Sequence, residues 1–254
     1  MKKMNLKHLA ILAMATMSLA SCEYDNYEAP SYEFKGQLVT EDGEKFLYDA
    51  NKTLFKFYQS GFGKEDLGIN MNVDNSGAFK QLLFEDYYEL TLVNQTLPFE
   101  MPDFPSKGAG LGYERIPFSI GGNVAQNYVV RPYYKISGLK AELSANGKNI
   151  VATFNVQKMT NTEKEAPRIK TARLYLGTST IIDSGTNCLR SQNVSASDPT
   201  SITVQIPLAF YRDKRYYVNN FRTYAYYRVS IELDGIPDYF LFSDIQKIEG
   251  LPLN

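Results

Sequence analysis

The fold class of this chain follows from residues 139–156, which read LKAELSANGKNIVATFNV. Apolar and polar residues alternate through Leu139–Leu143 and again through Ile150–Val156. A period of two residues is typical of a strand that buries one face. Asn146-Gly147 lies between the two runs and is a strong signal for a hairpin turn. The stretch therefore predicts an antiparallel β-hairpin.

The same pattern continues on both sides of this hairpin. Alternation returns at Ile202–Leu208 and at Tyr227–Leu233, where Asp234-Gly235 ends the run as a turn. Before the hairpin, the strand candidates are Phe34–Val39, Leu54–Tyr58, Ile69–Val73, Phe79–Phe84, Tyr88–Leu92, Ile116–Ile120 and Tyr128–Ile136. Pro132 in the last of these indicates an edge strand or a bulge. Many short strands with turn signals between them predict an all-β protein. The 19 Tyr and 15 Phe of the chain also favour strands.

The beginning of the chain has the features of a secretory signal peptide, which we place at residues 1–21. Three lysines precede the uncharged apolar run Leu9–Leu19, which is too short to span a bilayer as a helix. The ending Leu19-Ala20-Ser21-Cys22 resembles the lipobox of bacterial lipoproteins, in which the chain is cut before the cysteine and the thiol is lipidated. We therefore predict lipidation of Cys22 and a membrane attachment by the lipid anchor only.

Behind the anchor we expect a tether and two domains. Residues 22–33 are polar and acidic. Acids directly after a lipidated cysteine resemble export signals for the outer face of the outer membrane, so we expect the protein on the cell surface; an ordinary solvated tether is the alternative. The remaining length suits two tandem β-sandwich domains, at residues 34–123 and 124–254, with Gly121-Gly122-Asn123 at the boundary.

Composition argues against several classes of function. The predicted signal peptide contains the single histidine, His8, and three of the 27 basic residues, whereas none of the 28 acids lies there. The rest of the chain is therefore mildly acidic and has no basic run, which argues against nucleic acid and anionic lipid as partners. Cys188 is left as a free thiol without the base that a nucleophile needs. We predict no catalytic residue, no metal site and no cofactor.

Several short motifs in this order carry a family resemblance. They are Gly36–Val39, Val73–Phe79, Leu83-Phe84, Tyr88–Leu90, Val130–Tyr133, Asn149–Phe154, Tyr216-Tyr217 and Tyr226–Val229. Together they resemble a two-domain family of outer-membrane lipoproteins, domain of unknown function 3823. The resemblance implies an N-terminal sandwich of the transthyretin or carboxypeptidase-regulatory type and an immunoglobulin-like C-terminal domain. It also implies a place beside TonB-dependent transporters of the Sus (starch-utilisation-system) type and their lipoprotein partners.

A row of tyrosines and arginines is the strongest candidate site. If the run that begins at Tyr227 faces the core, period two places four residues on the outer face: Arg222, Tyr224, Tyr226 and Arg228. Exposed tyrosine rings pack on sugars, and phenol and guanidinium groups hydrogen-bond sugar hydroxyls. The same row suits a protein interface, or internal packing against the first domain or a long loop.

These features lead to one functional hypothesis. We expect a non-catalytic, cell-surface lipoprotein that assists TonB-dependent nutrient uptake and binds a glycan or a peptide through the row. One alternative is a structural subunit that docks on the transporter without a ligand of its own. A fimbrial or adhesin-type lipoprotein is a further alternative, and an enzyme is the last.

Overall fold

The computed structural model describes residues 28–59, 67–108, 111–185, 188–191, 194–195, 201–212 and 221–252. The predicted signal peptide, Cys22 and the motif Tyr216-Tyr217 lie outside these residues. The strands belong to one compact unit, Ser31–Asn254. We call residues 32–132 the first module and residues 134–252 the second module.

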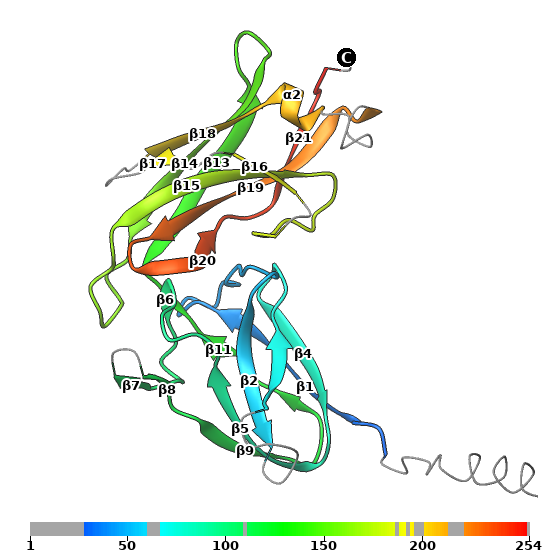
Figure 1. The fold of residues 1–254 in the computed structure, drawn as a ribbon, viewed down its shortest axis with the longest axis vertical. Coiled ribbons are helices and arrows are strands. Elements are labelled where there is room, and N and C mark those ends of the chain that lie inside the picture. Colours follow the sequence, from blue (N-terminus) through cyan, green and yellow to red (C-terminus); the bar gives the residue numbers. More distant parts are fainter. Residues whose placement is uncertain are drawn as a thin grey trace, which may run out of the picture. The chain divides into compact units, whose positions relative to one another are not determined.

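The first module is a sandwich of two sheets (Figure 1). In one sheet β1 (Tyr32–Val39) pairs antiparallel with β4 (Ala78–Leu83) and parallel with β10 (Val124–Ala125) and β11 (Tyr128–Val129). The other sheet is antiparallel, in the order β3 (Ile69–Asn72), β2 (Thr53–Gln59), β5 (Asp86–Leu92) and β9 (Ile116–Ile120). Two small ladders join β7 (Ser106–Gly108) to β8 (Gly112–Tyr113), and β6 (Phe99–Glu100) to β12 (Arg131–Pro132).

Aromatic side chains fill the space between these two sheets. The ring of Phe34 in β1 lies edge-on to that of Phe57 in β2, with 5.3 Å between ring centroids. Phe79 of β4 and Phe55 of β2 meet in the same way at 5.2 Å. All four side chains are buried. Because such pairs contribute about 0.5–1.5 kcal/mol beyond their area, the phenylalanines of the sequence hold this sandwich together.

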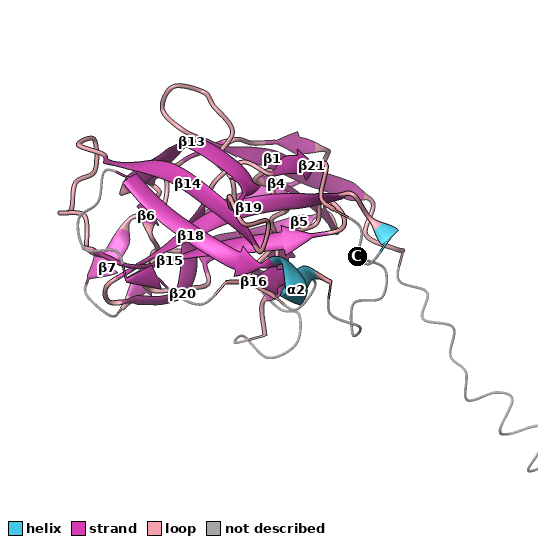
Figure 2. Ribbon diagram, turned by 90° about the horizontal axis from the view of Figure 1, so that it is seen from above, coloured by secondary structure: helices cyan, strands magenta, loops and turns pink. Residues whose placement is uncertain are grey.

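The second module also contains two main sheets. One has the order β13 (Tyr134–Leu143), β14 (Asn149–Lys158) and β18 (Ser201–Pro207). In the other, β15 (Ile169–Gly177) pairs with β19 (Tyr224–Leu233). The strands β16 (Leu189–Arg190) and β17 (Val194–Ser195) pair with β15, whereas β20 (Ile236–Phe242) and β21 (Gln246–Glu249) pair with β19. A short helix, α2 (Leu208–Tyr211), follows β18 directly (Figure 2).

The predicted hairpin is confirmed as β13 and β14. These strands pair antiparallel, with Leu143 opposite Ile150, and Gly147 in the connecting turn has φ +66°, where glycine is favoured. On β14 the alternate residues Ile150, Ala152 and Phe154 are buried in the main core. The structure confirms the predicted fold class, an all-β protein with two tandem sandwich domains.

The passage from the first module to the second differs from the sequence expectation. Residues 128–136 read as one strand, yet they form β11, β12 and the start of β13, with partners in three different ladders. Pro132 lacks the N–H that a continuous ladder needs, which explains the interruption. The strands β10 and β11, which follow residue 123, pair with β1. The domain boundary at that residue stays a prediction.

Candidate ligand-binding site

The predicted row of tyrosines and arginines shares one face of β19, as period two requires. The alternate residues of the strand are buried in the main core; they are Ala225, Tyr227, Val229, Ile231 and Leu233. Tyr224, Tyr226 and Arg228 therefore point to the other face, and Arg222 precedes the strand. Tyr224 and Tyr226 are half-buried, whereas Arg228 is completely buried. The row thus divides into an accessible end and a covered end.

Arg228 forms the covered end, and its predicted exposure is wrong. Its side chain is 0% exposed. Nη1 donates a hydrogen bond to the carbonyl oxygen of Ile182 at 3.0 Å, and the guanidinium lies 3.9 Å from the centroid of the Phe242 ring. Two longer contacts, both 3.5 Å, reach the carbonyl oxygen of Tyr48 in the first module. Segments distant in sequence cover this end of β19, and alternation within the strand cannot reveal them.

The buried guanidinium has a charged neighbour in the first module. Burial lowers the pKa of Arg228 to about 10, and the negative charge of Asp49 opposes this shift. Asp49 is only 2% exposed; its Oδ1 accepts hydrogen bonds from the backbone N–H of Ser184 at 3.0 Å and of Asn51 at 3.2 Å. Its Oδ2 has no hydrogen-bond partner among the described residues. Arg228 therefore belongs to the contact between the modules rather than to an exposed surface.

Tyr224 and Tyr226 form the accessible end, with two cations beside them. The two rings meet edge-on, with 5.8 Å between their centroids. The Lys247 ammonium lies 4.7 Å from the centroid of the Tyr224 ring, and the Arg222 guanidinium carbon lies 5.3 Å from it. Arg222 also donates a hydrogen bond to the Tyr224 hydroxyl, and Lys247 forms an ion pair with Glu249. We call Arg222, Tyr224, Tyr226 and Lys247 the tyrosine patch.

Elements behind the tyrosine patch hold the start of β19 in place. The Tyr211 hydroxyl, at the end of α2, donates a hydrogen bond to the carbonyl oxygen of Tyr224 at 2.8 Å. The backbone N–H of Leu251 donates to the carbonyl oxygen of Thr223 at the same distance. Tyr211 is completely buried, and burial raises its pKa to about 12. The patch therefore rests on a fixed backbone.

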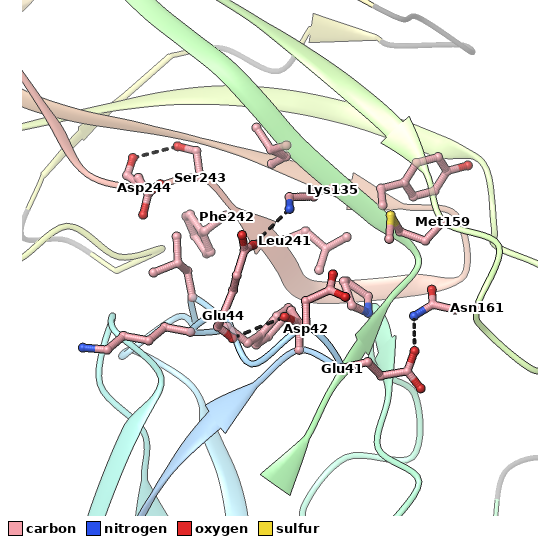
Figure 3. Close-up of a pocket in the computed structure, with 17 residues that line it drawn as sticks. Glu41, Asp42, Glu44, Lys135, Met159, Asn161, Leu241, Phe242, Ser243 and Asp244 are labelled. Atoms are coloured by element: carbon pink, nitrogen blue, oxygen red, sulfur yellow. Dashed lines mark hydrogen bonds and ion pairs between the residues drawn. The ribbon is translucent and has the colours of Figure 1, made fainter. Parts of the chain in front are cut away.

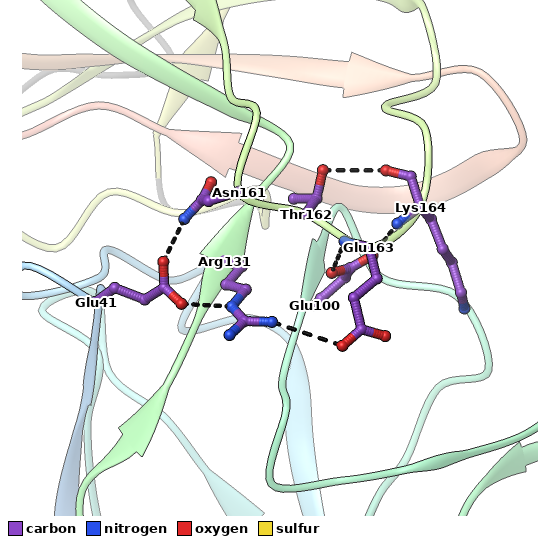
Figure 4. Close-up of polar contacts among 7 residues, drawn as sticks. All are labelled: Glu41, Glu100, Arg131, Asn161, Thr162, Glu163 and Lys164. Atoms are coloured by element: carbon purple, nitrogen blue, oxygen red, sulfur yellow. Dashed lines mark hydrogen bonds and ion pairs between the residues drawn. The ribbon is translucent and has the colours of Figure 1, made fainter.

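A second candidate is a cleft of about 610 Å³ beside residues 95–106 of the first module. This volume lies within the range of small-molecule sites, and Tyr113 and Tyr133 contribute to its walls. The carboxylate of Glu100, however, already accepts hydrogen bonds from the backbone N–H groups of Glu163 at 2.7 Å and Lys164 at 2.8 Å (Figure 4). This acid fixes a loop of the second module instead of facing a ligand.

Arg131 lines the same cleft, and its side chain is also already hydrogen-bonded within the protein. Its Nε donates a hydrogen bond to Glu41 at 2.6 Å, and Glu41 also accepts from Nδ2 of Asn161 at 2.8 Å, as Figure 4 shows. Hydrogen bonds from Asn161 and then from Arg131 lower the pKa of Glu41. Glu100 and the pair of Arg131 with Glu41 thus connect the two modules.

A smaller cavity lies next to this network (Figure 3). Glu41, Asp42 and Glu44 line it from the first module, and Leu241 and Phe242 line it from β20. Lys135 closes one side through an ion pair with Glu44 at 3.0 Å. Its volume of about 180 Å³ is below the 300 Å³ or so that marks the lower limit of most ligand sites. The tyrosine patch therefore remains the better candidate.

Reactive groups in the described part of the chain are few. Burial raises the pKa of Cys188 to about 11, and its thiol donates to the carbonyl oxygen of Asp183 at 3.2 Å, so it is protonated at neutral pH. Over the same residues, no cluster of three or more His, Cys, Asp or Glu side chains is suited to a metal ion. No described helix has the length and apolarity to cross a bilayer.

Sequence reasoning missed one member of the tyrosine patch. Lys247 comes from β21, where it pairs with Tyr226 of β19. Period two in Gln246–Glu249 predicts that Lys247 and Glu249 share one face of a strand. The sequence pattern does not show that this strand pairs with β19 beside Tyr226. The predicted binding roles of Arg222, Tyr224 and Tyr226 stay predictions.

Comparison with solved structures finds proteins of the same fold. A DUF3823 family protein from Parabacteroides merdae matches with a TM-score of 0.64 at 20% identity, over 87% of this chain and 100% of that one. One from Bacteroides ovatus matches with a TM-score of 0.59 at 20% identity, over 87% and 99%. A Bacteroides uniformis protein described as a candidate carbohydrate-binding protein matches with a TM-score of 0.61 at 16% identity, over 87% and 100%.

Family models give the clearest relationship. No curated protein matches the sequence. The model for the N-terminal domain of DUF3823, a protein family of unknown function, matches residues 32–131, and that for the C-terminal domain, DUF3823_C, matches residues 134–247. Both models lie in the order that the sequence motifs predict, and together they span most of the chain. The chain therefore belongs to the DUF3823 family.

Proposed function

We propose that this protein is a lipid-anchored, cell-surface accessory of TonB-dependent nutrient uptake that binds a glycan without catalysis. The proposal places the binding site at the tyrosine patch on β19 and β21. It assigns no role in binding to Arg228, because that side chain is buried. The Bacteroides uniformis protein of the same fold, which is described as a candidate for carbohydrate binding, supports the choice of a glycan.

The observation that carries this proposal is the half-buried pair of tyrosine rings with two cations beside Tyr224. Tyr224 and Tyr226 meet at 5.8 Å, and both stand on the face of β19 that turns away from the main core. A pyranose ring presents apolar C–H groups to an aromatic ring and hydroxyls to neighbouring donors. Arg222 and Lys247 supply such donors, at 5.3 Å and 4.7 Å from the centroid of the Tyr224 ring.

The location and the partners rest on the sequence. Leu19-Ala20-Ser21-Cys22 resembles a lipobox, so the proposal includes lipidation of Cys22 and the outer membrane as the site of action. The acidic residues that follow Cys22 support the cell surface. The proposed partners are a Sus-type TonB-dependent transporter and its lipoprotein partner.

Binding to immobilised glycans tests the assigned site. Electrophoresis of the purified full-length protein through gels that contain glycans should show retardation by at least one of them. Tyr226→Ala should weaken this binding about two- to tenfold, since an aromatic contact contributes about 0.5–1.5 kcal/mol. Tyr87→Ala is the matched control, because Tyr87 is 45% exposed but lies on β5 in the first module. Equal retardation of Tyr226→Ala and wild type by every glycan would contradict the proposal.

A docking subunit without its own ligand is the second candidate. Two large apolar side chains support it: Phe210 is 54% exposed and Phe221 is 69% exposed. They lie at the end of α2 and just before Arg222, near the start of β19. Exposed aromatic rings are favoured anchors of protein interfaces. Co-purification with the transporter from detergent extracts, together with glycan binding that is absent in every assay, would favour this candidate over the first.

A further inference from the structure

We propose that the glycan recognised by the tyrosine patch is acidic, with carboxylate or sulfate groups on its sugars. This inference rests on the proposed function and narrows its ligand to one chemical class. It follows from the charges around Tyr224 and from the contacts that those charges already make.

The tyrosine patch carries a positive charge, whereas the chain as a whole is close to neutral. The chain as a whole has 27 basic and 28 acidic residues. At the patch, Arg222 and Lys247 both lie within 5.3 Å of the centre of the Tyr224 ring. Among the described residues, Glu249 is the acid that forms an ion pair with the patch, through Lys247. The local balance therefore favours an anion.

Arg222 is the cation best placed to meet an anion. None of the described carboxylates lies within ion-pair distance of its guanidinium, which donates to the Tyr224 hydroxyl instead. Its side chain is only partly buried, unlike that of Arg228. A guanidinium binds a carboxylate or a sulfate with two parallel hydrogen bonds. An oxyanion on a sugar would give Arg222 the anionic partner that the described residues do not supply.

The first module contains a similar pair that is already neutralised. There the Arg115 guanidinium lies 3.7 Å from the centroid of the Tyr58 ring and also forms an ion pair with Glu89 at 3.2 Å. The two sites share an arginine on a tyrosine, but only the first-module arginine has a carboxylate beside it. Glu89 therefore neutralises the charge of Arg115 within the chain. Among the described residues, no carboxylate does the same for Arg222.

A neutral sugar fits the tyrosine patch less well. Lys247 lies over the Tyr224 ring, so a sugar that stacked on the same ring face would have to displace the ammonium. An acidic sugar that displaces the ammonium regains ion pairs with Lys247 and Arg222 through its oxyanion, which a neutral sugar does not. The carboxylate of a uronic acid and a sulfate ester share this chemistry, and the experiment separates them.

Pairs of matched glycans test the inference with the full-length protein. Polygalacturonate is compared with its carboxyl-reduced form, and chondroitin sulfate with its desulfated form, each at low and at high salt. The acidic member of at least one pair should bind ten times more tightly than its less charged counterpart, and added salt should weaken it. Binding that follows the carboxylate identifies a uronate, and binding that follows the sulfate identifies a sulfated sugar.

Variants of the arginine tie this preference to the tyrosine patch. Arg222→Gln should reduce acidic-glycan binding about tenfold and flatten its salt dependence. Arg222→Lys should retain part of both, because lysine keeps the charge but not the paired hydrogen bonds. Arg115→Gln is the matched control and should bind like wild type. Circular dichroism of each variant verifies that it is folded.

The outcomes distinguish the inference from the function that it rests on. Neutral glycans that bind as tightly as acidic ones, with sensitivity to Tyr226→Ala, would overturn the acidic class and leave the glycan-binding site standing. Acidic binding that Arg222→Gln and Arg115→Gln weaken equally would overturn the role of Arg222. The absence of binding to every glycan, acidic or neutral, would overturn both proposals.

Discussion

Replacing Arg228 by methionine tests whether the buried arginine stabilises the contact between the modules. Methionine has a similar length and no charge, so the substitution removes interactions without opening a large cavity. The structure specifies what is lost: the hydrogen bond from Nη1 to Ile182 at 3.0 Å, and the stacking of the guanidinium on Phe242 at 3.9 Å. It also leaves the buried carboxylate of Asp49 without its positive neighbour.

The expected magnitude follows from these three losses. A hydrogen bond from a charged donor contributes about 1.5–3 kcal/mol, and a desolvated cation–π contact about 1–2 kcal/mol. The cost of burying the guanidinium disappears with the substitution and offsets part of this. The two 3.5 Å contacts to Tyr48 add little because of their length. We therefore expect Arg228→Met to lower the free energy of unfolding by about 3 kcal/mol, near the lower end for breaking a buried charge pair.

A double-mutant cycle with Asp49→Asn isolates the electrostatic part. Asparagine keeps an Oδ1 that can accept from Ser184 but carries no charge. In that background Arg228→Met should cost about 1 kcal/mol less than in wild type, which is a coupling of ordinary size for neighbouring groups. Urea unfolding followed by circular dichroism and tyrosine fluorescence measures all four free energies, and the chain has no tryptophan to complicate the signal.

Two results would refute this reasoning. A cost below about 0.5 kcal/mol for Arg228→Met would mean that the desolvation of the arginine cancels its contacts. Equal costs of Arg228→Met in wild type and in the Asp49→Asn background would mean that the charge of Asp49 has no part in holding the arginine.

Three further predictions concern other parts of the fold. The pKa of Glu41 is lower in the folded chain than in the unfolded chain. Its contribution to stability is therefore present above the unfolded pKa and is lost as the pH falls through the folded pKa. The midpoints of thermal unfolding of wild type and Glu41→Gln, measured from pH 6 to pH 3, should converge at the acidic end. A Cβ at Gly36 would lie 1.7 Å from a backbone oxygen, so Gly36→Ala should lower the unfolding free energy by about 3 kcal/mol in urea, whereas Gly122→Ala, with open space around it, should change it by less than about 0.5 kcal/mol. Cys188 should react slowly with iodoacetamide at pH 7.5 and quickly once urea unfolds the chain, because burial raises the pKa of its thiol to about 11; rapid labelling of the folded protein would contradict this.

Local pattern was sufficient for most strands of this protein. Alternation at Ile150–Val156 and the turn at Asn146-Gly147 predict β13 and β14, and the burial of every second residue in β19 follows from the same period. These features depend on residues a few positions apart, so the sequence contains them directly. Pro132 indicates the interruption of the strand, but the sequence pattern does not show which strands pair with β11 and β12.

The tyrosine row shows where local pattern stops being sufficient. Period two assigns Tyr224, Tyr226 and Arg228 to one face with equal force, yet Ile182 and Tyr48 cover only the last of them. These two residues lie 46 and 180 positions from Arg228 in the sequence, and nothing in the strand specifies them.

A face predicted by alternation is therefore only a candidate surface, because contacts between distant segments decide which part of it solvent reaches. The same contacts change the chemistry of chemically identical side chains. Arg228 is a buried link between two modules, whereas Arg222, six positions earlier on the same row, has no carboxylate partner among the described residues. A guanidinium that the fold encloses between two modules holds the structure, and a partly exposed one without a carboxylate beside it is available for a ligand.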